Sequence, residues 1–162
     1  MIDPAVKHVD KLGGAPHSKR SLRLWLRLLS CSTVVEKRIR ALLEADFGST
    51  LPRFELLSAL ERHPEGLRMS ELSSSMMVSN GNVTGVVSRL IRDRLVSRVR
   101  APNDRRVATV RLTPKGRQTF ARMARVHEGW IDEMFGELTG GQIDSLMKLL
   151  AHLRHSVESA GR

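Results

Sequence analysis

The sequence predicts a mainly α-helical protein that carries one β-hairpin. Between residues 21 and 158, apolar residues recur at helical spacing in six segments, which predicts six helices. The segments 96–100 and 108–112 instead alternate polar and apolar residues around a turn at Pro102, Asn103 and Asp104, which predicts a β-hairpin. We therefore expect one long helix, three short helices, the hairpin and two long helices, in that order.

The first helix is expected to be long and to follow a basic tail. Residues 1–20 contain glycines, prolines and lysines without apolar periodicity, so we expect a flexible segment. The long helix should run from Ser21 to about Ala45. Its apolar stripe consists of Leu22, Trp25, Leu26, Leu29, Ile39, Leu42 and Leu43.

Capping residues mark the expected starts of the three short helices. Thr50, with Pro52 in the first turn, should cap the first of them. Ser70 should cap the second, about 70–77, and Ser79 should cap the third, about 80–94. The third helix is expected to turn Val83, Val86, Val87 and Leu90 inward.

Two long helices should follow the hairpin. Thr113 is the expected cap of the first, with Pro114 at its first position, and Gly140 and Gly141 precede the second. The expected buried stripe of the first consists of Phe120, Met123, Trp130 and Met134. The apolar residues of the second are Ile143, Leu146, Leu150, Leu153 and Val157.

Composition limits the classes of function that the chain can have. The chain has 162 residues and a formal net charge of +10, which points to a polyanionic partner. It has one cysteine, and it shows no signal-peptide pattern and no apolar run of the ~18 residues that a membrane span needs. We therefore expect a cytoplasmic protein without a membrane partner. No catalytic or phosphate-binding motif is present, so we expect neither an enzyme nor a bound cofactor or metal.

The positive charge is concentrated in one part of the sequence. Between Arg89 and Arg122 there are eleven basic and two acidic residues, whereas an ordinary solvated surface mixes the two signs. The two helices before this run have the spacing of a helix-turn-helix unit, whose second helix presents its first residues to DNA bases. The expected DNA-facing residues of this unit are Ser70, Ser79, Asn80, Asn82, Thr84, Ser88 and Arg89.

The hairpin tip completes the expected DNA-binding surface. Asn103, Asp104, Arg105 and Arg106 lie together there. A carboxylate among arginines suits a charge-assisted pair that shapes the tip and directs an arginine into the minor groove. The alternative is an ordinary turn aspartate.

The motifs together resemble the MarR family of winged helix-turn-helix regulators. They are Leu51-Pro52-x-Phe54, Ser70-Glu71-Leu72, Val78-Ser79 with Val83-Thr84, Leu95-Val96, Asp104-x-Arg106 and Leu112-Thr113-x-x-Gly116. The resemblance covers about residues 22–158. One departure is Arg94, where the family commonly has a glycine that helps the preceding helix to stop.

The resemblance implies a homodimer, interleaved through its first and last helices, that binds a pseudo-palindromic operator in double-stranded DNA. Proteins of this family are usually repressors that release DNA when a small, often aromatic, ligand binds, so the resemblance implies the same for this chain. We accordingly expect three parts: a tail (1–20), a helical dimerisation region (21–48 and 113–160) and a winged helix-turn-helix DNA-binding region (49–112).

The first helix also contains a candidate ligand site. Residues 30–33 are four small, weak helix formers within the first helix. They either leave room for an effector or let another helix approach closely. The effector class that we expect is an aromatic acid or an aromatic acyl-CoA thioester. The expected contacts are Trp25, Leu29, Ser32, Thr33, Phe54, Leu57, Met76 and Met77.

Two other sensing chemistries have less support. Cys31 resembles a peroxide sensor only in being an N-terminal cysteine, and the chain has no tyrosine to activate its thiol. We expect a small buried residue there. His152 and His155 lie three residues apart, but a zinc site needs further ligands, so we expect surface histidines.

Two rival functions remain. A basic nucleic-acid-binding or chromosome-organising protein would need no effector and would show no preference for a palindromic duplex. Association with a membrane surface would need a basic amphipathic helix with exposed aromatic residues, and the chain has only two tryptophans and four phenylalanines. The apolar first and last helices favour the dimeric regulator.

Overall fold

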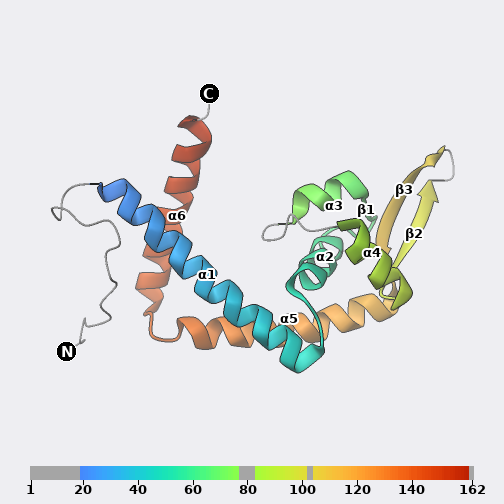
Figure 1. The fold of residues 1–162 in the computed structure, drawn as a ribbon, viewed down its shortest axis with the longest axis horizontal. Helices are drawn as coiled ribbons and strands as arrows, with labels where there is room; N and C mark the ends of the chain where they lie inside the picture. The colour runs from blue at the N-terminus through green and yellow to red at the C-terminus, as the bar shows by residue number, and fades with distance from the viewer. Residues whose placement is uncertain (1–18, 77–82, 102–103, 161–162) are drawn as a thin grey trace. The chain divides into compact units, whose positions relative to one another are not determined.

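The computed structural model describes residues 19–76, 83–101 and 104–160 (Figure 1). The chain divides into two compact units, one ending at Gly48 and the other beginning at Ser49. The expected order of a long helix, short helices, a hairpin and two long helices is confirmed. No helix among these residues is both long and apolar enough to cross a membrane.

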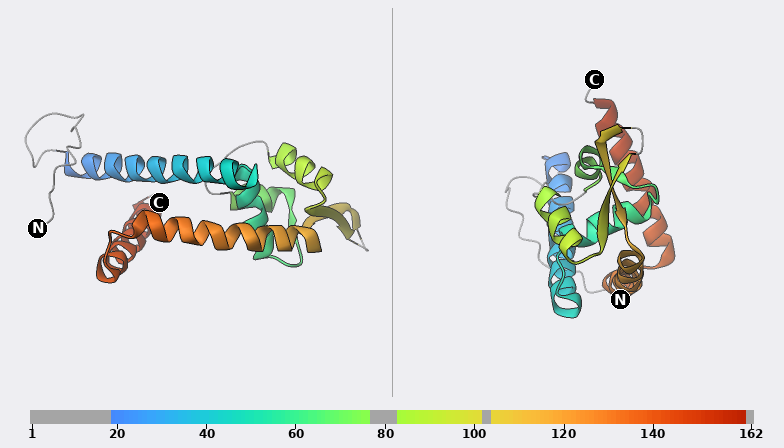
Figure 2. Two further views of the ribbon diagram at one scale, coloured as in Figure 1. Left: turned by 90° about the horizontal axis from the view of Figure 1, so that it is seen from below. Right: turned by 90° about the vertical axis from the view of Figure 1, so that its right-hand side faces the viewer.

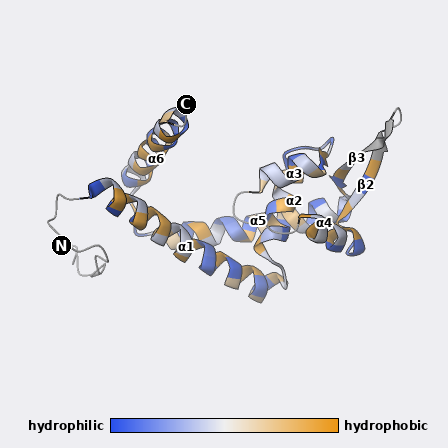
Figure 3. Ribbon diagram, turned by 45° about the horizontal axis from the view of Figure 1, so that its top comes forward, coloured by the Kyte–Doolittle hydropathy of each residue, from blue (hydrophilic) through white to orange (hydrophobic). Residues whose placement is uncertain are grey.

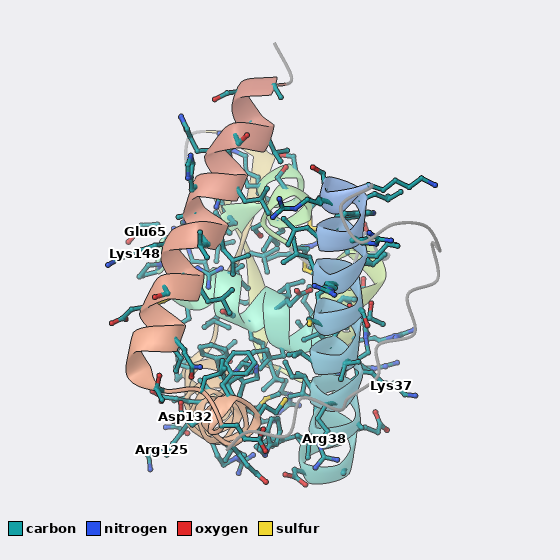
Figure 4. All side chains as sticks on the ribbon, turned by 90° about the vertical axis from the view of Figure 1, so that its left-hand side faces the viewer. Lys37, Arg38, Glu65, Arg125, Asp132 and Lys148 are labelled. Atoms are coloured by element: carbon teal, nitrogen blue, oxygen red, sulfur yellow. The ribbon has the colours of Figure 1, made fainter. Side chains whose placement is uncertain are left out.

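The first unit contains the helix α1, Arg20–Phe47. The helix ends at Gly48, which has a left-handed φ of 54°, and the Gly48 N–H donates to the Glu44 carbonyl at 2.9 Å. Glycine adopts this conformation without steric cost, so it sets the helix end. The expected end near Ala45 was two residues short. Lys37 and Arg38 extend away from α1 (Figure 4).

The second unit begins with α2, Leu51–Glu61, which is the centre of the core. Thr50 occupies the N-cap position as expected, although its hydroxyl makes no capping bond. Pro52 lies in the first turn, where a missing N–H costs nothing. The largest fully buried side chains of this unit are Leu56, Leu57, Leu60, Leu72, Val87, Leu90 and Val110.

The expected cap of the next helix was wrong. The helix α3, Met69–Ser75, begins one residue before Ser70, and its N-cap is Arg68. The Glu71 carboxylate accepts from the Arg68 backbone N–H at 2.6 Å. This side chain satisfies the helix start from inside the first turn, so Ser70 is left as an exposed helical residue.

A three-stranded antiparallel sheet has the order β1-β3-β2, with β1 at Leu67–Arg68, β2 at Val96–Ala101 and β3 at Asp104–Leu112. The expected hairpin is confirmed, and β2 and β3 run side by side in two views (Figures 1 and 2). Asp104, expected in the turn, instead begins β3 and pairs with Ala101. The strand β1 was not expected, because two residues cannot show an alternating pattern.

The helix α5, Pro114–Phe135, starts as the sequence predicts. The Thr113 hydroxyl oxygen accepts from the Gly116 N–H at 3.0 Å, which satisfies one of the free donors of the first turn. Met123 and Trp130 are buried as expected, whereas Phe120 and Met134 are half-buried. Fewer residues of α5 are therefore fully buried than its sequence pattern predicts.

The last helix, α6, Gly140–Ala160, has no buried residue within the chain. Apolar bands nevertheless interrupt the polar ones along its length (Figure 3). Its exposed large apolar side chains are Leu146, Met147, Leu149, Leu150 and Val157. A monomeric protein rarely exposes so many large apolar side chains on one helix, so this helix is suited to an interaction.

An aromatic cluster joins α2 to α5. The rings of Phe54 and Phe120 lie 5.5 Å apart, and the His127 ring lies 4.7 Å from Phe54 and 6.3 Å from Trp130. Burial lowers the pKa of His127 below its ordinary value of 6.5, because removal from water disfavours the charged imidazolium.

This burial predicts a pH-dependent stability. Because the pKa of His127 is lower in the folded chain than in the unfolded chain, the unfolded state binds more protons as the pH falls through 6.5. We expect the midpoint of thermal unfolding to fall between pH 7 and pH 5, and to fall less in His127→Phe, which keeps a ring against Phe54. The control His152→Gln, on α6, should keep the wild-type decrease. Equal decreases in His127→Phe and the wild type would contradict this role.

Candidate nucleic-acid interface

The helix α4, Val83–Arg92, has one apolar side and one polar side. Val83, Val87 and Leu90 are buried in the core, as the sequence predicts. Thr84, Ser88 and Arg89, which were expected to face DNA, are exposed. Their hydroxyl and guanidinium groups can hydrogen-bond to phosphates and to base edges. Ser79, Asn80 and Asn82, expected on the same side, lie outside the described residues.

The end of α4 differs from the expectation. The helix was expected to reach Arg94 but ends at Arg92, and Arg94 has a left-handed φ of 60°. The Leu95 N–H then donates to the Leu90 carbonyl at 2.9 Å and closes the last turn. Arg94 therefore ends the helix in the backbone conformation that glycine usually adopts at this position, although arginine carries a side chain. That conformation is unfavourable for a residue with a Cβ.

Three serines of α3 lie beside an open hollow on the surface of the second unit. The hollow has a volume of about 540 Å³ and is lined by His63, Leu67, Ser70, Glu71, Ser74 and Ser75. Ser70 is exposed here, and its expected contact with DNA stays a prediction. The Ser74 hydroxyl donates to the Ser70 carbonyl at 3.1 Å.

The wing is the hairpin of β2 and β3. Arg98 is exposed, and its backbone pairs with that of Val110. Arg111 pairs with Glu65 at 3.2 Å. Asp104, Arg105 and Arg106 belong to β3, and Asn103 lies outside the described residues. The role of this tip in DNA binding stays a prediction.

The exposed surface around α4 and the wing is strongly basic. Among the side chains that the structure describes, seven exposed basic residues come from α4, the turn after it, β2 and the first turns of α5: Arg89, Arg92, Arg94, Arg98, Lys115, Arg117 and Arg122. Among the residues of 89–122 whose side chains the structure describes, Asp93 is the one acidic residue. Its carboxylate pairs with Arg53 at 2.6 Å. Such a surface attracts the DNA backbone.

Sequence reasoning missed this contact between Arg53 and Asp93. The two residues are 40 positions apart, and neither belongs to a motif or periodic pattern that points to the other. Asp93 was counted only as a charge in the basic run. Its position directly after α4 was the available signal, since a carboxylate in a basic surface needs a partner.

The residues expected to contact an effector lie in different environments. Phe54, Leu57 and Met76 are buried in the second unit, whereas Trp25 is 56% exposed and Leu29 45% exposed. Ser32 and Thr33 are exposed, and both hydroxyls donate to the Leu29 carbonyl, at 3.0 and 2.7 Å. Met77 lies outside the described residues. The effector site stays a prediction.

The structure also shows where the cysteine and the two histidines considered for sensing lie. Cys31 was expected to be buried, but its thiol is exposed within the chain, because the neighbouring part of α1 has no buried residue. His152 and His155 are exposed on α6. Among the described residues no group of three or more potential metal ligands comes together.

Comparison with known proteins decides the family. A model of the MarR family matches residues 49–108. YdgJ, an HTH-type transcriptional regulator of Bacillus subtilis (strain 168), is 30% identical over 125 residues, which is 77% of this chain and 76% of that protein. The chain belongs to the MarR family. It is a DNA-binding transcriptional regulator with the winged helix-turn-helix fold, and it is not an enzyme.

Other similarities extend beyond the matched segment of this MarR-family chain. The crystal structure of a MarR family transcriptional regulator from Silicibacter pomeroyi is 28% identical, with a TM-score of 0.73 over 91% of this chain and 99% of that chain. The transcriptional activatory protein BadR of Rhodopseudomonas palustris (strain ATCC BAA-98 / CGA009) is 32% identical over 120 residues, 73% of this chain and 66% of BadR. The fold thus includes the long helices outside the matched residues 49–108.

The left-handed Arg94 predicts a stabilising substitution. In Arg94→Gly the backbone keeps its conformation without the Cβ penalty, so the free energy of unfolding should rise by about 1 kcal/mol. Urea unfolding followed by circular dichroism measures this change. Arg89→Gly, in the right-handed interior of α4, removes the same charge and should instead lose about 1 kcal/mol. A loss of stability in both variants would show that Arg94 is not strained.

Proposed function

We propose that the chain is a homodimeric transcriptional repressor that binds a pseudo-palindromic operator and releases it when a small aromatic ligand binds. The observation that carries this proposal is the exposed polar side of α4 within a basic surface. Thr84, Ser88 and Arg89 are exposed there, on a helix whose other side is anchored in the core. A major groove admits one such helix.

Self-association is supported by α6. None of its residues is buried within the chain, and Leu149 and Val157 are 66% and 65% exposed. A second copy would cover these side chains and gain the free energy of burying apolar surface. We assign residues 21–48 and 113–160 to dimerisation, residues 49–112 to DNA binding and residues 1–20 to a basic tail.

A dimer explains the form of the operator. Two copies of α4 related by a twofold axis would enter successive major grooves about one helical turn apart, so the two half-sites would be inverted. Each wing would reach the flanking minor groove, where Arg105 or Arg106 would be attracted by its negative potential. Repression then needs only that the dimer occupies DNA that a polymerase must use.

The test of the DNA and dimer proposal combines sequence selection with one substitution. The wild-type chain should enrich an inverted repeat from a library of random duplexes. Leu150→Glu places a charge in the apolar stripe of α6, so it should give a monomer in sedimentation and weaken binding to the selected duplex about a hundredfold, because linked half-sites no longer cooperate.

The matched control is His152→Glu. Residue 152 lies two positions further along α6 and roughly on its opposite side, since each residue turns a helix by about 100°. It adds the same charge and should leave the dimer and the DNA affinity unchanged. Enrichment of no sequence by the wild type would instead support a general chromosome-organising protein. A Leu150→Glu dimer with full affinity would place the interface elsewhere.

The effector class is an aromatic acid or an aromatic acyl-CoA thioester. Exposed apolar side chains of α1, Trp25 and Leu29 among them, suit an aromatic ring. The basic tail, which includes Lys7, Lys11 and Lys19, suits the phosphates of a thioester.

A thermal-shift screen should identify the effector class. Benzoate, 4-hydroxybenzoate and benzoyl-CoA are the first probes. A compound that binds the folded chain should raise its unfolding temperature in proportion to the logarithm of the ligand concentration. The same compound should then release the selected duplex. A compound that stabilises the protein and leaves DNA binding unchanged would contradict release by that ligand.

A further inference from the structure

The C-terminal end of α4 is held by side chains from two other helices of its unit. Arg53 comes from α2 and Lys115 from the first turn of α5. We propose that Arg53, Asp93 and Lys115 are positioning residues that fix the angle at which α4 meets DNA. This inference rests on the proposed function in one respect only: that α4 is the helix that reads the DNA.

Asp93 is the centre of this arrangement. Its Oδ2 accepts from Arg53 Nη2 at 2.6 Å, and its backbone carbonyl accepts from Lys115 Nζ at 3.0 Å. The Arg53 side chain is 22% exposed and that of Asp93 38% exposed. One residue directly after the helix is therefore bonded to both α2 and α5.

The next two backbone carbonyls are bonded to the same part of α5. The Thr113 hydroxyl donates to the Arg94 carbonyl at 2.7 Å, and the Thr113 N–H donates to the Leu95 carbonyl at 3.0 Å. A Cβ at Gly116 would lie 1.9 Å from the Leu95 carbonyl oxygen. Residues 93–95 are consequently bonded to or packed against the start of α5 at each position.

The charges at this point favour a positioning role over a direct DNA contact. The Asp93 carboxylate neutralises Arg53, which leaves little charge for a phosphate. Asp93 itself repels the DNA backbone, so its presence weakens general attraction to DNA. It also lies at the negative end of the α4 dipole, where an isolated carboxylate is unfavourable. A role in holding α4 accounts for both of these costs.

Position matters because base readout depends on geometry. A single or bidentate hydrogen bond to a base edge is lost when the donor atom moves by a fraction of the hydrogen-bond length. Attraction to phosphates tolerates the same movement, because it depends weakly on orientation. Loosening the end of α4 should therefore reduce operator recognition more than general DNA binding.

Asp93→Asn tests this difference directly. The probes are the duplex selected by the wild-type chain and a shuffled duplex of equal length and composition. We expect the dissociation constant for the selected duplex to rise about tenfold, a size common for residues in one hydrogen-bonded network. Binding to the shuffled duplex should stay equal or tighten, because the variant is more basic. A merely structural loss of folded protein would weaken both.

Glu36→Gln is the matched control. Glu36 pairs with Arg40 within α1, also at 2.6 Å, so the substitution removes one carboxylate and one ion pair of equal length. It should leave the ratio of the two affinities unchanged. Circular dichroism and thermal unfolding of each variant will show that the compared proteins are folded.

Exchange of the two charges provides a rescue. Arg53→Asp and Asp93→Arg should each lower the ratio of selected to shuffled affinity, and the double variant should recover most of it. If Asp93→Asn instead binds the selected duplex as tightly as the wild type, or more tightly, Arg53 is not positioning α4 and this inference is overturned. If the wild-type chain selects no duplex, the proposed function itself fails, and the two failures are distinct.

Discussion

One short backbone segment, Leu95 and the two residues before it, joins α4, the hairpin and α5. Thr113 serves both sides of this junction, because its hydroxyl accepts from the Gly116 N–H and donates to the Arg94 carbonyl. Gly116 leaves the space that the Leu95 carbonyl occupies. Both ends of the hairpin and both neighbouring helices therefore depend on the same few atoms.

Two surfaces with opposite chemistry follow from this arrangement. Seven exposed basic residues lie on α4, the turn after it, β2 and the first turns of α5, whereas α6 carries exposed apolar residues and no buried ones. A surface that binds a polyanion gains free energy when its cations neutralise phosphates and release counterions, whereas a surface that binds a second copy gains it by removing apolar side chains from water. Separate helices allow the chain to keep the two requirements apart.

Much of this fold could be predicted from sequence pattern. The spacing of Val83, Val87 and Leu90 identified the buried side of α4, and Thr113 with Pro114 identified the start of α5. Both signals are local, because a period or a cap involves residues within one or two turns.

The remaining features follow from details of a single turn or from contacts between distant residues, and neither leaves a periodic pattern in the sequence. Glu71, rather than Ser70, satisfies the start of α3, and β1 is too short to have a period. Arg94 has a left-handed, glycine-like conformation, and its own carbonyl accepts from the hydroxyl of the distant Thr113. Arg53 meets Asp93 only when α2 packs beside the end of α4. The effector residues and the hairpin tip keep their status as sequence predictions.

The hydroxyl groups of α1 have a consequence for the chemistry of ligand recognition. Ser32 and Thr33 both give their protons to the Leu29 carbonyl, so the lone pairs that remain on their oxygens only accept hydrogen bonds. While these bonds persist, a group that hydrogen-bonds to either oxygen must bring its own proton, as a phenol or an amide does. They offer nothing to a carboxylate, whose recognition would fall to cationic side chains.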